Sequence, residues 1–304
     1  MNPHGLTPSD PSSETQHRSL AADLVTLTKP RIISLLLVTT IAAMYIAGTP
    51  RIGLVIAVFV GGYMMAGGAN AVNMYLDRDI DISMARTKQR PIPSGRMSPL
   101  AVLSFGVALA TAATYLLATV ANILTAGLAL AGFYCYVFVY TRWLKRTTPQ
   151  NIVIGGAAGA FPPLVGYAAV TGSLDLTAWI LFLIVFYWTP PHFWALALLK
   201  QRDYGAAHVP MAPLIWGEKH TIDQMLWYTG ILIALTVLPF CTGALGLVYL
   251  ISALVIALPL VYGVVQTRRP ENRVKAAQFV FKYSLLYLAL LYVAMVVDVH
   301  LPLT

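Results

Sequence analysis

The sequence alternates long apolar runs with short polar segments. Hydrophobic residues make up 58% of its 304 positions and charged residues only 11%, which excludes an ordinary soluble domain. A helix needs about 20 apolar residues to cross a bilayer, and nine runs are long enough. The pattern therefore predicts an all-α, polytopic membrane protein whose nine transmembrane helices are bundled around a central cavity. The predicted spans are residues 32–50, 53–73, 99–118, 121–140, 151–171, 177–199, 225–243, 245–266 and 278–298.

Outside these runs, the composition predicts one domain and a tail. Residues 1–20 are rich in Ser, Pro, Thr and charge, and we expect a disordered cytoplasmic tail there. No change in composition divides residues 21–304, so we expect a single transmembrane domain. Pro162-Pro163 and Pro190-Pro191 predict interruptions of the fifth and sixth helices. Small residues such as Gly67-Gly68 predict close helix packing.

The basic residues lie mostly in alternate loops. A net charge of +8 can indicate nucleic acid as a partner, but the 20 Lys and Arg residues follow the membrane pattern instead. They gather before the first span and after the second, fourth, sixth and eighth, and only Arg51 lies in a loop of the opposite set. This positive-inside pattern predicts a cytoplasmic N-terminus and an outside C-terminus, with no nucleic acid as partner.

The end of the second span carries a set of acidic and amide side chains. Asn73, Asp77 and Asp81 follow one another at four-residue spacing, so on a helix they share one face, whereas Asp79 points away. Two carboxylates one turn apart repel by about 1 kcal/mol in water and about 4 kcal/mol at an effective dielectric of 20, so they favour a bound cation. Mg²⁺ fits such oxygen ligands and keeps positions open for phosphates. The bases that follow suit a diphosphate: Arg86, Lys88, Arg90 and Arg96.

Three segments carry a resemblance to a known family. Residues 73–91 contain NxxxDxxxD followed by MxRTxxRP, residues 28–31 read TKPR, and residues 188–194 read WTPPHFW before Asp203-Tyr204 and residues 209–213. Together they resemble the UbiA-type intramembrane prenyltransferases and, within that superfamily, the protohaem IX farnesyltransferases, or haem O synthases. The similarity covers residues 22–298.

The resemblance implies an Mg²⁺-dependent transfer of a farnesyl group from farnesyl diphosphate to a vinyl group of haem b, giving haem O and free diphosphate. It implies the lipid bilayer and a downstream haem A synthase as further partners, and a bacterial inner-membrane location. Catalysis is assigned to Asn73, Asp77, Asp81, Lys88 and Arg90, and metal binding to Asn73, Asp77, Asp81 and Asp203. Substrate contacts are assigned to Lys29, Arg31, Arg86, Arg96, Trp188, His192, Trp194, Asp203 and Tyr204.

Several of these residues also have a plainer interpretation. Many relatives carry a second acidic pair near the end of the sixth span, but this sequence has Pro191-His192 there, which leaves Asp203 as the main acid of the loop. Asp203 binds a second Mg²⁺, or it forms a salt bridge with Arg202 or with a basic residue of the other loop. His192 either ligates haem or transfers a proton, or it is a hydrogen-bonded structural residue. Lys29 and Arg31 bind a propionate or lipid phosphate, or only set the topology.

Other functions stay open at this point. The nearest alternative is a related prenyltransferase that acts on a quinone precursor or a chlorophyll-type acceptor. A different class is a cation-coupled transporter, whose acidic site is expected near the middle of the bilayer rather than at its rim. A non-catalytic scaffold for oxidase assembly would tolerate Asp77→Asn.

Overall fold

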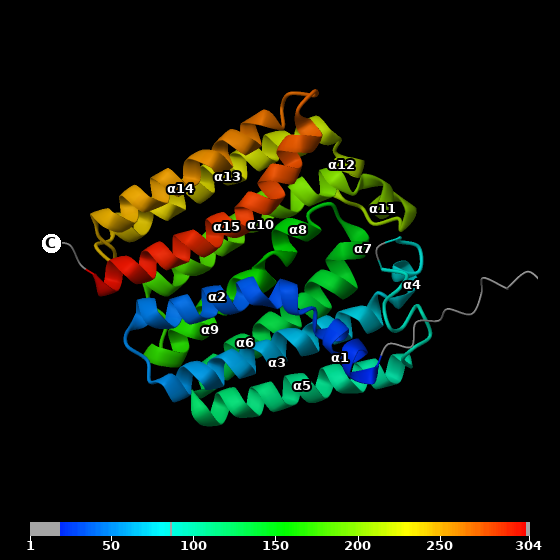
Figure 1. Ribbon diagram of the computed structural model, residues 1–304, viewed down its shortest axis with the longest axis horizontal. Coiled ribbons are helices and arrows are strands. Elements are labelled where there is room, and N and C mark those ends of the chain that lie inside the picture. Colours follow the sequence, from blue (N-terminus) through cyan, green and yellow to red (C-terminus); the bar gives the residue numbers. More distant parts are fainter. Residues whose placement is uncertain (1–18, 86, 302–304) are drawn as a thin grey trace, which may run out of the picture.

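The computed structural model describes residues 19–85 and 87–301, and helices joined by turns and loops make up this part of the chain, which contains no β-strand (Figure 1). The predicted tail at residues 1–20 falls almost entirely outside the described residues. The elements are α1 (Leu20–Thr28), α2 (Pro30–Ala47), α3 (Ile52–Leu76), α4 (Arg78–Asp81), α5 (Pro99–Val120), α6 (Ile123–Tyr134), the π-helix η1 (Cys135–Leu144), α7 (Lys145–Thr147), α8 (Asn151–Gly155), α9 (Ala157–Thr171), α10 (Leu176–Leu199), α11 (Gln201–Ala206), α12 (Ala212–Ile215), α13 (Glu218–Cys241), α14 (Leu247–Gln266) and α15 (Arg273–His300).

The nine predicted membrane helices are confirmed. Nine stretches of the described chain are helical, long and apolar enough to cross a bilayer. The fourth consists of α6, η1 and α7, and the fifth of α8 and α9, whereas each of the others is one helix. The seventh starts at Glu218 instead of residue 225, because its polar first turn follows Gly217, whose φ of 80° ends the preceding loop.

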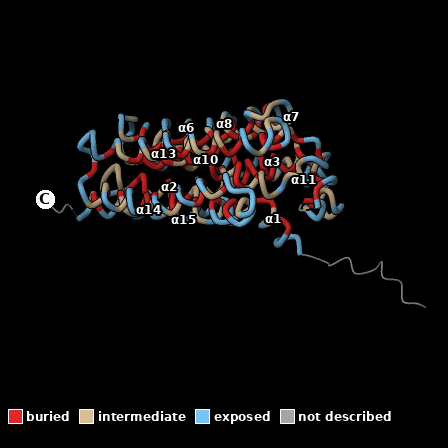
Figure 2. The backbone as a smooth tube through the Cα atoms, turned by 90° about the horizontal axis from the view of Figure 1, so that it is seen from above, coloured by how far each residue is buried: buried red, intermediate tan, exposed pale blue. Residues whose placement is uncertain are grey.

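The helices pack as two groups that share one core. Helices α2, α3, α5, α6 and α9 pack together, as do α10, α13, α14 and α15, and the groups meet where α9 packs on α10 and α2 on α15 (Figure 1). Buried residues run along the inside of the bundle over its whole length (Figure 2). The short helices α4, α7, α11 and α12 gather at one end, and the C-terminus lies at the other (Figure 1). The assignment of the first end to the cytoplasm stays a prediction from the charge pattern.

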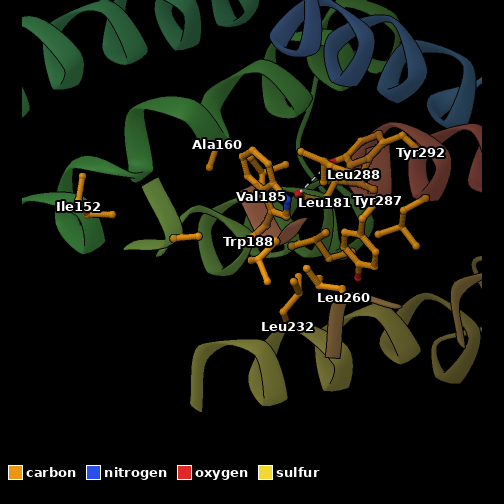
Figure 3. Packing of buried hydrophobic residues seen from close by; sticks show 14 of the residues in the cluster. Ile152, Ala160, Leu181, Val185, Trp188, Leu232, Leu260, Tyr287, Leu288 and Tyr292 are labelled. Carbon is orange, nitrogen blue, oxygen red and sulfur yellow. Dashed lines mark hydrogen bonds between the residues drawn. The ribbon is translucent and has the colours of Figure 1, made fainter. Parts of the chain in front are cut away.

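The core of the second group is built around α10 and α15. Tyr292 of α15 donates a hydrogen bond from its hydroxyl to the carbonyl oxygen of Leu181 on α10, at 3.0 Å. This bond satisfies a polar group that would be costly to leave unpaired in a membrane interior. Figure 3 shows the packing of buried side chains from α10 (Leu181, Val185, Trp188), α15 (Tyr287, Leu288, Tyr292), α13 (Leu232) and α14 (Leu260).

Glycines set the closest helix contacts, as predicted for the small residues. A Cβ on Gly68 of α3 would lie 2.6 Å from the carbonyl oxygen of Gly106 on α5. A Cβ on Gly166 of α9 would lie 1.9 Å from the carbonyl oxygen of Thr40 on α2. Both distances are below van der Waals contact, so only glycine allows these backbones to approach.

The predicted interruptions at the proline pairs were wrong. Pro162 lies inside α9 and Pro190 inside α10, and α10 is one helix from Leu176 to Leu199. The break in the fifth span occurs upstream, between α8 and α9 at Gly156, where a Cβ would lie 2.8 Å from the Thr189 methyl carbon. A proline removes one hydrogen bond and crowds the preceding turn, but it does not by itself end a helix that neighbouring helices hold in place.

A groove runs along the outside of α2, α3 and α15. It has a volume of about 840 Å³ and an almost entirely apolar lining that includes Leu37, Ile41, Phe59 and Val293. One end of the groove is formed by Pro30, which directly follows Lys29. A groove of this shape suits a long apolar chain. The predicted central cavity stays a prediction.

Candidate functional site

The predicted acidic set lies at the end of the bundle where α3 gives way to α4. The backbone NH of Asp77 donates to the carbonyl oxygen of Asn73, and that of Asp81 to Asp77, each at 2.9 Å, so helical spacing continues through the junction. Asn73, Asp77 and Asp81 are only 4%, 1% and 1% exposed. The side chain of Asp79, by contrast, is 59% exposed. The prediction that three side chains share one face and that Asp79 points away is therefore confirmed, and the shared face is buried.

Each member of this set meets a basic side chain. Lys29 Nζ donates to Asn73 Oδ1 at 2.9 Å, and Lys145 Nζ forms an ion pair with Asp77 Oδ2 at 2.5 Å. The contact at Asp81 is two-fold, because Arg90 Nη1 donates to Oδ1 at 2.9 Å and to Oδ2 at 2.7 Å. A buried carboxylate is stable only when it is paired or hydrogen-bonded. The basic side chains therefore neutralise the site as it stands.

An unusual backbone conformation brings Lys29 into the site. Lys29 joins α1 to α2 with a left-handed φ of 55°, which is uncommon for a residue other than glycine. The turn is held from α3, because Asn70 Nδ2 donates to the carbonyl oxygen of Thr28 at 2.9 Å and the Thr28 hydroxyl lies 2.8 Å from that of Tyr63. Burial, reinforced by the nearby charge of Arg90, holds the pKa of Lys29 well below its usual range. Strain of this kind is typical of functional positions.

The fourth span supplies residues that the sequence analysis did not select. In η1 the Thr141 hydroxyl donates to the carbonyl oxygen of Tyr136 five residues earlier, at 2.8 Å, and accepts from Asn73 Nδ2 at 3.1 Å. One turn later Lys145 reaches Asp77. π-helical turns are rare and frequently lie at functional sites. The polar pair Thr141 and Lys145, four residues apart at the end of an apolar run, is the available signal, but the charge pattern alone places Lys145 among the basic residues that set the topology.

Arg146 connects the two spans at the rim of the site. Its guanidinium forms hydrogen bonds of 2.6 and 2.7 Å with the carboxylate of Asp79 and one of 2.8 Å with the carbonyl oxygen of Leu76. The hydrogen bond from Arg146 lowers the pKa of Asp79 to about 2. Arg146 Nη2 also lies 3.7 Å from Asp77 Oδ1. This contact places a second positive charge beside the buried carboxylate.

The donor set fits a hard cation. Among the described residues, Asp77 Oδ1 is buried and has no hydrogen-bond partner, so one carboxylate oxygen remains available. Two carboxylates and one amide oxygen suit Mg²⁺, which normally takes its other ligands from water and phosphate. No group of three His, Cys, Asp or Glu side chains within the described ranges forms a ready metal cage. The fit therefore depends on movement of the basic side chains away from the acidic oxygens.

The other predicted basic residues are distributed around the rim. Lys88 and Arg31 are exposed, and Arg86 lies outside the described residues. Arg96 contacts Asp23 in α1 and not the acidic set. It forms hydrogen bonds of 3.0 to 3.1 Å with the buried carboxylate of Asp23, and one of 3.1 Å with the carbonyl oxygen of Gln89. Arg96 thus connects α1 to the loop that carries the site.

The aromatic segment of α10 lies in the core. His192 is 5% exposed and stacks with the rings of Trp188 and Phe281, with centroids 4.6 and 4.8 Å apart. Its Nδ1 lies 2.8 Å from the Ser284 hydroxyl of α15, and Trp188 Nε1 donates to the Ser284 carbonyl oxygen at 2.7 Å. Of the two interpretations of His192, these contacts favour the structural one. Trp194 is also buried and packs edge-on against Tyr228.

The loop after α10 is anchored away from the acidic set. Asp203 and Tyr204 lie on α11, half-buried, and the described residues form no ion pair with Asp203. Gln201 Nε2 instead donates to Glu218 Oε1 at 2.6 Å, and Glu218 also pairs with Arg273. Helices α11 and α4 nevertheless lie at the same end of the bundle (Figure 1). The metal role of Asp203 stays a prediction.

Comparison with known proteins identifies the class to which this bundle and site belong. The sequence profile of the UbiA prenyltransferase family matches residues 36–286, from the first membrane helix to the middle of the last. The chain belongs to the UbiA prenyltransferase family.

The names of individual relatives are more specific than the name of the family. A protoheme IX farnesyltransferase of Symbiobacterium thermophilum is 49% identical, and the match covers 93% of this chain and 96% of the relative. A protein of the same name from Roseiflexus sp. (strain RS-1) is 54% identical over 92% of this chain, but the chain spans only 53% of the length of that relative. A solved UbiA homolog from Archaeoglobus fulgidus, bound to DMAPP and Mg²⁺, has the same fold, with a TM-score of 0.70, 15% identity, and coverage of 90% of this chain and 99% of the other.

Proposed function

We propose that this protein transfers a farnesyl group from farnesyl diphosphate to a vinyl group of haem b, with Mg²⁺ and the addition of one water molecule, giving haem O and diphosphate. The observation that carries the proposal is the buried set Asn73, Asp77 and Asp81, faced by three bases at one end of a UbiA bundle. The names of the relatives support haem as the acceptor. A bacterial inner-membrane location is part of the proposal, and a haem A synthase stays a predicted partner.

The residues divide into two roles. Asn73, Asp77 and Asp81 would hold Mg²⁺, with Asp203 as a further candidate from the second loop. Bound Mg²⁺ supplies positive charge to the diphosphate as it leaves. Lys29, Arg90 and Lys145 lie close enough to the same oxygens to bind that diphosphate directly. Positive charge in place before the reaction stabilises the charge that develops on the leaving group.

The apolar residues near the site suit the second part of the reaction, in which the farnesyl carbocation has to be protected from water. Loss of diphosphate from an allylic substrate leaves a carbocation that water would destroy, so water has to be kept away until the haem vinyl group attacks. The attack moves the positive charge to the vinyl carbon next to the porphyrin ring, and one water molecule then adds there and loses a proton, which gives the hydroxyl group of haem O. The groove along α2, α3 and α15 begins beside Lys29 and accommodates an isoprenoid chain. Lys88, Arg86 and Arg31 are proposed to attract charged groups at the rim, and Trp188, His192, Trp194 and Tyr204 to shape the haem side.

The depth of the site favours an enzyme over a transporter. Asp77 follows the last residue of α3, so the acids lie at one end of a membrane helix and not at its middle. A transporter site is expected near the bilayer midplane, among interrupted helices. The basic side chains around Asp77 also suit an anionic substrate better than a transported cation.

The activity is tested directly with purified protein, haem b, farnesyl diphosphate and Mg²⁺. Mass spectrometry of the porphyrin should show a product heavier by one farnesyl group and one hydroxyl group, and EDTA or Asp77→Ala should abolish it. Asp79→Asn is the matched control, because Asp79 is an exposed acid of the same segment. Unmodified haem, together with prenylation of a quinone precursor in a parallel reaction, would favour the alternative acceptor.

A further inference from the structure

The acidic site holds at least as much positive as negative charge before any metal binds. Four basic side chains meet three carboxylates and one amide, in the contacts Lys29–Asn73, Arg90–Asp81, Lys145–Asp77 and Arg146–Asp79. Even without Lys29, the three remaining bases match the three carboxylates. A cation site normally attracts its ion through an excess of negative charge, and the described residues provide no such excess here.

The two oxygens of Asp77 show what a cation would have to displace. Oδ1 has no hydrogen-bond partner among the described residues, but Arg146 Nη2 lies 3.7 Å from it. Oδ2 is held by Lys145 at 2.5 Å and also accepts from Asn73 Nδ2 at 2.8 Å. A bare dication would therefore approach two positive charges and compete with a short, buried ion pair.

An anion changes this balance. A diphosphate carries several negative charges and accepts hydrogen bonds from ammonium and guanidinium groups. If Lys145 moves from Asp77 to such an anion, the carboxylate becomes free for the metal and the charge of the complex is compensated. Lys145 is able to make this exchange because its side chain is flexible and carries a compact charge.

We propose that the site binds its anion and its metal as a pair, with Lys145 keeping the metal off Asp77 until the diphosphate arrives. This inference rests on the proposed function, and it deepens it by setting the order of binding: the resting site is a receptor for the diphosphate, alone or with its metal, and a poor receptor for the free metal. Lys145 is then both a counter-ion of the resting site and a ligand of the substrate.

The test on the unaltered protein measures Mn²⁺ by electron paramagnetic resonance and inorganic diphosphate by calorimetry. Each is titrated alone and in the presence of the other, with free concentrations corrected for the complex that they form in solution. Diphosphate should raise the affinity for Mn²⁺ about tenfold or more, and Mn²⁺ should raise that for diphosphate by the same factor, since coupling is reciprocal. Mn²⁺ that binds equally tightly without diphosphate would overturn the proposal.

The variants separate this proposal from the ordinary cooperation of a metal with a phosphate. Lys145→Met should strengthen binding of Mn²⁺ alone several-fold and weaken binding of diphosphate alone, because it frees Asp77 and removes a ligand of the anion. Lys145→Arg keeps the charge and should leave Mn²⁺ binding weak, which tests the idea even if Lys145→Met does not fold. Lys275→Met, an exposed lysine at the start of α15, is the control and should change neither. Unchanged Mn²⁺ and diphosphate binding in folded Lys145→Met would contradict the role of Lys145.

Failure of this proposal differs from failure of the proposed function. If free Mn²⁺ binds tightly and farnesylated haem is still formed, the proposal of paired binding is contradicted and the proposed reaction is supported. If Mn²⁺ and diphosphate bind in a coupled way but no haem product is formed, the proposal of paired binding is supported and haem as the acceptor is contradicted.

Discussion

Two long loops lie at the site end of the bundle, one after α3 and one after α10, and they are held in different ways (Figure 1). The loop after α3 is held by buried polar contacts, such as Arg90 with Asp81 and Arg96 with Asp23. The loop after α10 is held mainly by apolar side chains, because Val209, Met211 and Ala212 are buried in the core. The two loops therefore lie at the same end of the bundle but differ in chemistry, and the buried charged contacts are concentrated in the first loop.

The strongest test of this difference compares one acid from each loop. Asp77→Asn removes a buried carboxylate that faces Lys145, and we expect turnover to fall about 100-fold or more, the usual loss when transition-state charge stabilisation is removed. Asp203→Asn should reduce turnover less than about tenfold, because Asp203 is half-buried and the described residues form no ion pair with it. Steady-state kinetics with farnesyl diphosphate measure both. Equal losses would mean that the loops contribute equally to the metal site.

The helices were predictable because membrane spans depend on hydrophobicity over about 20 residues, a property that needs no tertiary information. The prediction of helix interruptions at the proline pairs was wrong because packing against neighbouring helices, which the sequence does not show, determines whether a helix ends at a proline. The actual break lies at Gly156, which closely approaches Thr189, a residue 33 positions further along the chain.

The acidic half of the site was predictable for a similar reason, since Asn73, Asp77 and Asp81 belong to one helical face. Their partners were not. Lys145 lies 68 positions from Asp77 in the chain, and the π-helical turn of η1 sets which of its residues point inward. No local pattern distinguishes Lys145 from a basic residue that only sets topology, whereas the fold does so by burying its contact with Asp77.

Stability should show the same difference between buried and exposed charge. Arg96→Met leaves the carboxylate of Asp23, with a 4% exposed side chain, without its partner, and we expect a loss of about 2 kcal/mol in the free energy of unfolding, since Arg96 itself is partly exposed. Arg268→Met breaks the exposed pair with Asp223 and should change it by less than about 1 kcal/mol. Thermal unfolding in detergent compares them. A larger loss for Arg268→Met would contradict this ranking.

The contact between α10 and α15 tests the structural interpretation of His192. Ser284→Ala removes the hydroxyl beside His192 Nδ1 but keeps the backbone carbonyl that accepts from Trp188. We expect a loss of about 1 kcal/mol in the free energy of unfolding, as for a single hydrogen bond, and little change in the KM for farnesyl diphosphate. Ser284→Thr retains a hydroxyl and is the matched control. An altered visible spectrum of bound haem in Ser284→Ala, without a loss of stability, would instead indicate that His192 contacts the haem iron.

The smallest expected effect concerns Asp79, the exposed acid of the first loop. Its pKa is lowered to about 2 in the folded protein by the hydrogen bond from Arg146, compared with about 3.9 in an unfolded chain. The pair therefore contributes its full stabilisation above about pH 4, and the contribution disappears as the pH falls through about 2. Because the Asp79 side chain is 59% exposed, we expect the pair to contribute only about 0.3 kcal/mol to the free energy of unfolding. The difference in unfolding midpoint between the wild type and Asp79→Asn should be constant from pH 8 to about 5 and shrink below about 4. A difference that grows as the pH falls would show that Asp79 is not the ionised partner of Arg146.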